Sequence, residues 1–130
     1  MAPTIVYWIS TCLLSAIYLL SATIYIRTPE VAKTGHTQLG YVAPNLIPFM
    51  IVIKILAPIA IISRVSVGLS DLAYAGLFYH LIISGLAHYG VRNAKGMMPA
   101  IIGMILLLLS FATQNAARLT QSPYKPHLPF

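Results

Sequence analysis

Four long apolar segments constrain this chain more than any other feature of its sequence. They cover residues 5–26, 42–63, 69–89 and 99–117. A helix of about 20 residues crosses the hydrocarbon core of a bilayer, where every backbone amide must bond within the protein. The segments lack the alternating polarity of transmembrane barrel strands. The sequence therefore predicts an all-α integral membrane protein with four transmembrane helices.

The composition supports a location in the lipid bilayer. Only 8% of the residues are charged and 58% are hydrophobic, whereas a soluble domain carries about 25% charged residues. The net charge is +6, and the basic residues are spread singly or in pairs, mostly between the apolar segments. Nucleic-acid binders gather their cations on one face. We therefore expect a multi-pass membrane protein whose partner is the bilayer and not a nucleic acid.

Short connections predict how the helices are arranged. All connections except the first are short, so we expect residues 1–130 to form one antiparallel four-helix domain with both termini on one side. The first connection, "RTPEVAKTGHTQLGY", contains Thr28 followed by Pro29, which suit the N-cap and first position of a short interfacial helix. The tail, residues 118–130, contains three prolines and is predicted to be extended.

Three ionisable side chains fall inside the predicted spans: Lys54, His80 and His88. Such residues are costly in a membrane and are functional hypotheses by default. Lys54 lies near the middle of the second span, and Pro58, which has no N–H, leaves the Lys54 carbonyl without its helical donor. Lys54 is interpreted in two ways, as a side chain that snorkels or bonds neighbouring helices, and as a cation that lines an internal polar pocket.

The third segment, "DLAYAGLFYHLIISGLAHYG", predicts a polar helix face. At about 100° per residue, His80 and His88 share a face with Ala73, Gly76 and Ser84. Small residues mark close helix packing in membranes, so this face is predicted to point into the bundle. Tyr74 is interpreted as a membrane-belt or packing residue, with a pocket role as the alternative. The candidate ligand pocket is therefore lined by Lys54, Tyr74, His80, Ser84 and His88.

The chemistry of the two histidines is left open by the sequence. Eight residues of helix separate them by about 12 Å, too far to share one metal ion with bonds of about 2 Å. We therefore predict no metal site. Three roles stay open: hydrogen bonds between helices, contact with a lipophilic ligand, and a proton path with Lys54. In an enzyme, His80 and His88 would be the catalytic acid–base groups.

The chain resembles the DoxX-like family, small four-helix membrane proteins of the wider DoxX/DoxD group. The resemblance covers most of the chain and rests on these motifs: Ser21, Pro29-Glu30, Leu39-Gly40-Tyr41, Lys54-Ile55-Leu56 and Leu72-Ala73-Tyr74-Ala75-Gly76-Leu77-Phe78 leading to His88. Two positions depart from the family pattern. Tyr25 stands where a basic residue often ends the first helix, and His80 stands near the place of an acidic or amide residue.

The resemblance implies a four-helix fold and suggests a class of ligand. The DoxD relatives form the membrane subunit of a thiosulfate:quinone oxidoreductase, which implies a quinone-facing or partner-binding role. We therefore expect a polar intramembrane pocket for a lipophilic, quinone-like molecule in a redox-linked complex, with a membrane redox partner or a second copy of the chain. The sequence contains no evident cofactor motif, and a quinone is the one cofactor that the resemblance suggests. Two alternatives stay open: a stand-alone isomerase or hydrolase of lipophilic rings or epoxides that uses histidine acid–base chemistry, and a structural or assembly subunit.

Overall fold

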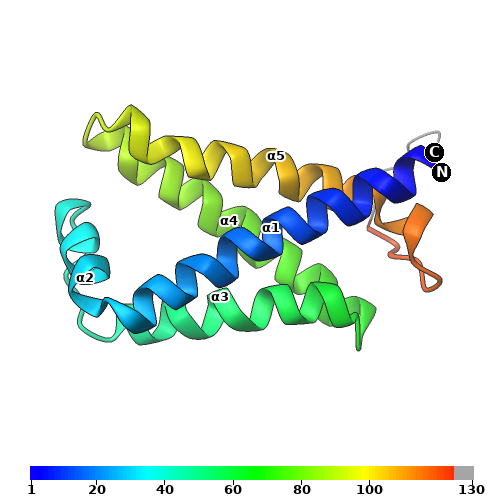
Figure 1. Ribbon diagram of the computed structural model, residues 1–130, viewed down its shortest axis with the longest axis horizontal. Coiled ribbons are helices and arrows are strands. Elements are labelled where there is room, and N and C mark those ends of the chain that lie inside the picture. The colour runs from blue at the N-terminus through cyan, green and yellow to red at the C-terminus, as the bar shows by residue number, and fades with distance from the viewer. Residues whose placement is uncertain (125–130) are drawn as a thin grey trace.

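The computed structural model describes residues 1–124 (Figure 1). Its helices are α1 (Ala2–Arg27), α2 (Pro29–Gln38), α3 (Leu46–Ser63), α4 (Val67–Gly90) and α5 (Ala94–Ala117). Four of them, α1, α3, α4 and α5, are long and apolar enough to cross a membrane. The predicted all-α class with four apolar spans is confirmed. Residues 118–124 form no helix, and the rest of the predicted extended tail lies outside the described residues.

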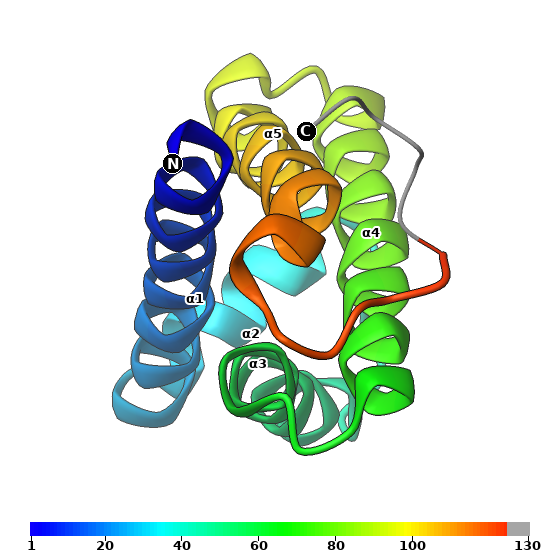
Figure 2. The same ribbon diagram turned by 90° about the vertical axis from the view of Figure 1, so that its right-hand side faces the viewer.

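The four long helices form an antiparallel bundle. Helix α1 packs beside α3 and α5, and α4 packs beside the same two helices, so α1 and α4 face each other along a diagonal (Figure 2). The start of α1 and the end of α5 lie at one end of the bundle, which we call the terminal end. Helix α2 lies at the opposite end, called the α2 end (Figure 1). Helix α1 runs obliquely, close to α5 at the terminal end and close to α3 at the α2 end.

Capping residues explain why two helices begin before their apolar runs. Helix α4 begins at Val67, two residues early, because the Ser66 hydroxyl accepts a hydrogen bond from the amide of Leu69 at 3.3 Å. Helix α5 begins at Ala94, five residues early, because the side-chain oxygen Oδ1 of Asn93 accepts a hydrogen bond from the backbone amide of Gly96 at 2.9 Å. Polar residues of the connections therefore set these starts, not the membrane.

The predicted short helix after Thr28 is present as α2. Pro29 occupies its first position, and Ala32 is its buried residue. Gly40, with φ of 89°, then turns the chain back toward the bundle in a left-handed conformation that suits glycine. The structure thus places α2 across the ends of the long helices.

The face of α4 that points inward differs from the predicted one. Its buried residues are Ser70, Tyr74, Leu77 and Leu81, spaced as one helical face, while Gly76 is exposed. The small residue at the close helix contact belongs to α5 instead. A Cβ at Gly103 would lie 2.8 Å from a methyl carbon of Leu81. In this bundle, large side chains of α4 fill the space that small residues of α5 leave open.

Candidate functional site

Lys54 is buried in the half of the bundle next to α2. Its side chain is 6% exposed, which excludes the snorkelling interpretation. The ammonium lies 4.9 Å from the ring centroid of Tyr25 and 5.4 Å from that of Tyr18. The chain has only two acidic residues. Asp71 accepts a hydrogen bond from Ser122 at the terminal end, and Glu30 is exposed on α2. Within the described residues, the ammonium is therefore held by aromatic faces and not by a carboxylate.

Tyr18 connects this cation to His80. The Tyr18 hydroxyl lies 2.8 Å from Nδ1 of His80, and the two rings are tilted at a centroid distance of 5.6 Å. Tyr18 belongs to α1 and His80 to α4, so the hydrogen bond spans the diagonal of the bundle. A phenol both donates and accepts, and an imidazole does the same through its two nitrogens. The pair can therefore hold a proton on either partner.

A second tyrosine–histidine pair lies closer to α2, and one of its members belongs to that helix. The Tyr25 hydroxyl lies 2.8 Å from Nε2 of His36, with the rings edge to face at 5.5 Å. Burial, and then the positive charge of Lys54, lower the pKa of His36 below its ordinary value of 6.5. Both causes favour the neutral imidazole at this position. Within residues 1–124, its buried Nδ1 has no hydrogen-bond partner.

These five residues, Tyr18, Tyr25, His36, Lys54 and His80, form what we call the α2-end cluster. It contains one ammonium, two phenols and two imidazoles, and it carries a net positive charge. A cavity of about 240 Å³ adjoins it, in the wedge between the end of α1, α2 and the end of α4. The cavity is lined by Tyr25, His36 and His88, with Ile24, Val31 and Leu39 as its apolar wall. Such a space suits one ring of a small lipophilic molecule.

The structure divides the five predicted pocket residues into four groups. Lys54 and His80 come together in the α2-end cluster. His88 lines the adjoining cavity, and its ring packs so close to Gly96 that a Cβ there would overlap it. Ser84 is half-buried on α4. Tyr74 lies apart, in the other half of the bundle.

Tyr74 belongs to a chain of hydroxyl groups between three helices. Its hydroxyl lies 2.6 Å from the hydroxyl of Ser110 on α5, and that oxygen lies 2.6 Å from the hydroxyl of Thr11 on α1. Tyr74 is 3% exposed, so it is not a residue of the membrane belt. Its role near the centre of the bundle is to connect α4 to α5 and α1.

Sequence reasoning missed Tyr18, Tyr25 and His36 as site residues. A signal for the tyrosines was present, because Thr11, Tyr18 and Tyr25 recur every seven residues and so share one face of α1. In the sequence, Tyr25 stands out only as a departure from the family pattern at the end of the first helix. No such signal exists for His36, because its position depends on how α2 folds back over the bundle.

Arginines of the terminal end have oxygen partners, unlike Lys54. Arg118 donates from Nε to the hydroxyl of Tyr7 at 2.9 Å and from Nη2 to the carbonyl of Ile61 at 3.0 Å. Arg64 donates to the Gln114 side chain at 2.8 Å and to the Thr120 carbonyl at 2.7 Å. These bonds hold residues 118–124 across the end of the bundle (Figure 2). The arrangement is that of a structural network.

The role of the α2-end cluster has to be inferred from its own chemistry. Comparison with protein-family models, with curated proteins and with solved structures found no match to this chain. Among residues 1–124, no three His, Cys, Asp or Glu side chains gather where a metal ion could be held. The cluster offers hydrogen-bond donors and proton carriers beside a small cavity.

Proposed function

We propose that this chain is a DoxX-like membrane protein whose α2-end cluster binds a lipophilic, quinone-like molecule through its carbonyl oxygen, in a redox-linked membrane complex. The observation that carries the proposal is the buried ammonium of Lys54, which has no carboxylate partner within residues 1–124. A Lys at the centre of a span costs about 2.5–3.5 kcal/mol on insertion scales. Two aromatic faces offset about 0.5–2 kcal/mol of that cost. A ligand oxygen that accepts from the ammonium would offset more.

The other members of the cluster suit the same ligand. Tyr18–His80 and Tyr25–His36 each join a phenol to an imidazole at 2.8 Å. A quinone takes up protons at its oxygens when a redox partner supplies electrons. The two tyrosine–histidine pairs would hold and donate those protons, while Lys54 would orient the carbonyl. His36 lies on the interfacial helix α2, where water can return a proton to it.

A binding experiment with matched lysine variants tests the proposal. Full-length protein in lipid nanodiscs is titrated with decylubiquinone, and native mass spectrometry counts the molecules retained. We expect one bound molecule, and an affinity at least about tenfold weaker in Lys54→Met, because a charge-assisted hydrogen bond is lost. Lys95→Met is the control, since Lys95 is exposed at the start of α5. Equal binding by wild type and Lys54→Met would exclude this function.

The Tyr18–His80 pair also favours a second candidate, a stand-alone isomerase or hydrolase of lipophilic rings or epoxides. A phenol hydrogen-bonded to an imidazole beside a cation is a plausible acid–base arrangement. The measurement is turnover of a hydrophobic epoxide as a function of pH. We would expect His80→Gln to abolish turnover while the affinity for substrate stays unchanged. A pH–rate profile that is the same in His80→Gln and His36→Gln would exclude this candidate.

A further inference from the structure

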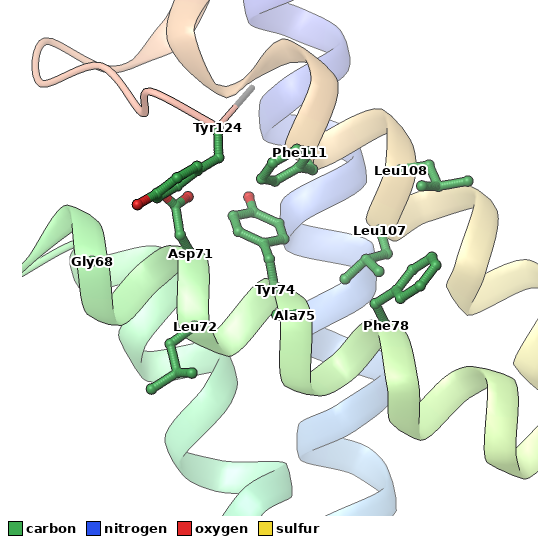
Figure 3. A pocket seen from close by; sticks show the side chains of 10 residues that line it. All are labelled: Gly68, Asp71, Leu72, Tyr74, Ala75, Phe78, Leu107, Leu108, Phe111 and Tyr124. Atoms are coloured by element: carbon green, nitrogen blue, oxygen red, sulfur yellow. The ribbon is translucent and has the colours of Figure 1, made fainter. Parts of the chain in front are cut away.

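A larger cavity lies in the other half of the molecule, between α4 and α5 (Figure 3). Its volume is about 550 Å³, within the usual range of small-molecule sites of about 300–1,000 Å³. The side chains that define it are Asp71, Tyr74, Phe78, Leu107, Phe111 and Tyr124. None of them belongs to the α2-end cluster, so this cavity is separate from the quinone-like site proposed above.

One end of this cavity is anionic. Asp71 accepts a hydrogen bond at Oδ2 from the hydroxyl of Ser122 at 2.7 Å. Within the described part of the chain, Oδ1 of Asp71 is buried and has no hydrogen-bond partner. Ser122 is fixed by two hydrogen bonds with the Asn115 side chain, at 2.8 and 3.0 Å. The carboxylate is therefore held in one orientation with an oxygen left for a donor, and a buried acceptor without a donor is costly.

Aromatic rings surround the space beside this carboxylate. Tyr74 is fixed by its hydrogen bond to Ser110 and meets Phe111 edge to face at a centroid distance of 5.3 Å. The ring of Tyr124 lies over Asp71 at the same end (Figure 3). Aromatic faces attract cations, and a carboxylate forms a charge-assisted hydrogen bond with an ammonium. This end of the cavity therefore has the chemistry that recognises an amine in its charged form.

The opposite end of the cavity is hydrocarbon. Phe78 lies seven residues beyond Asp71, or about 10 Å along α4. Leu107 of α5 lies beside Phe78 at this end (Figure 3). The cavity thus changes from anionic to apolar as it runs along α4 from the terminal end toward the middle of the bundle. A ligand that matches this gradient has a cationic head and an apolar tail.

We propose that this cavity binds a lipophilic ammonium compound, with its nitrogen at Asp71 and its hydrocarbon tail against Phe78 and Leu107. Charge complementarity at the site selects this class, because Asp71 is the one acidic side chain among the described residues that line the cavity. The same chemistry is offered by an amine-headed membrane lipid and by a free lipophilic amine. An anionic amphiphile would place a like charge against the Asp71 carboxylate.

Three eight-carbon probes that differ only in their head group test the proposal. Octylamine, 1-octanol and octanoate are titrated separately into full-length protein in phosphatidylcholine nanodiscs, and thermal unfolding is followed. We expect a saturable rise in the unfolding temperature with octylamine alone. Asp71→Asn should weaken octylamine binding at least about tenfold, because a charge-assisted hydrogen bond is lost. Glu30→Gln is the matched control, since it removes the chain's other carboxylate, which is exposed on α2.

A second variant separates loss of the site from loss of the fold. Ala75 lines the cavity and is exposed, so Ala75→Phe should fill the cavity and abolish octylamine binding while the carboxylate stays in place. Nanodiscs that contain phosphatidylethanolamine distinguish the two sources of amine. Displacement of octylamine by that lipid identifies a lipid ligand, and no displacement identifies a free amine. Equal stabilisation by octylamine and 1-octanol, or equal loss of binding in Asp71→Asn and Glu30→Gln, would overturn the proposal.

Discussion

Both ends of the bundle hold cationic side chains, but only one end surrounds them with oxygen atoms. At the terminal end, Arg118 and Arg64 donate to carbonyl, amide and phenol oxygens. At the α2 end, Lys54 meets the faces of Tyr18 and Tyr25, and no carboxylate in the described part of the chain pairs with it. A cation with several acceptors stabilises a fold, whereas a buried cation without them costs free energy and is a candidate for a functional role. The surroundings of each cation therefore support a structural role for the arginines and the functional role proposed for Lys54.

The difference follows from which segment covers each end. Residues 118–124 cross the terminal end, where the Thr120 carbonyl accepts from Arg64 and Arg118 reaches the carbonyls of Ile61 and Ile62 at the end of α3. Helix α2 covers the other end, and its carbonyls are already used within the helix. It contributes a side chain, His36, instead. An irregular segment thus supplies acceptors where a helix supplies a proton carrier.

The largest change in the free energy of unfolding is expected for a substitution at the terminal end. Arg118→Met removes hydrogen bonds to Tyr7, Ile61 and Ile62. Since hydrogen bonds to charged groups contribute about 1.5–3 kcal/mol each and are partly replaced by water here, we expect a loss of about 2–3 kcal/mol of unfolding free energy. Thermal or denaturant unfolding in detergent measures it. Arg92→Met, at an exposed position, is the control, and an equal loss in both variants would contradict a structural role for Arg118.

Lys54→Met is not expected to lower the free energy of unfolding as Arg118→Met does. This change removes a buried charge while retaining most of the apolar stem, so the cost of burying the ammonium disappears along with its contacts to Tyr18 and Tyr25. We expect the unfolding free energy to stay constant or rise by about 1 kcal/mol. The same unfolding measurement on Lys95→Met gives the baseline for an exposed lysine. A loss comparable to that of Arg118→Met would mean that the two ends do not differ in the way described.

The smallest expected effect is a dependence of the local stability of α2 on pH. Because burial and the charge of Lys54 lower the pKa of His36, the folded state binds a proton less readily than the unfolded state. The stability from neutral His36 is complete above the unfolded pKa of about 6.5 and is lost as the pH falls toward the folded pKa. Since His36 is only half-buried, solvent screens the effect.

Hydrogen exchange of the α2 amides, corrected for intrinsic rates, detects this dependence. We expect faster exchange at about pH 5.5 than at about pH 7.5. His36→Gln should remove the difference, and Lys54→Met should reduce it because one cause of the lowered pKa is absent. An unchanged difference in His36→Gln would assign the pH dependence to another group.

The helices were predictable because bilayer thickness fixes the length of an apolar span. Lys54 was equally visible, since a charge inside such a span stands out in the sequence. The inward face of α4 was not, because lipid and core are both apolar and hydrophobicity does not tell Leu72, which is exposed, from Leu77, which is buried. The pairing of Tyr18 with His80 depends on which helices lie diagonally, and no periodicity within one helix contains that information.

The coverage of both ends has a consequence for how the proposed ligands would enter. Helix α2 lies over one end of the bundle and residues 118–124 lie over the other (Figures 1 and 2). A molecule that moves from the lipid into either cavity would therefore pass sideways between two helices. Occupancy would follow the concentration of the ligand dissolved in the membrane. Two ligands of equal intrinsic affinity would then differ in apparent potency by the ratio of their oil–water partition coefficients.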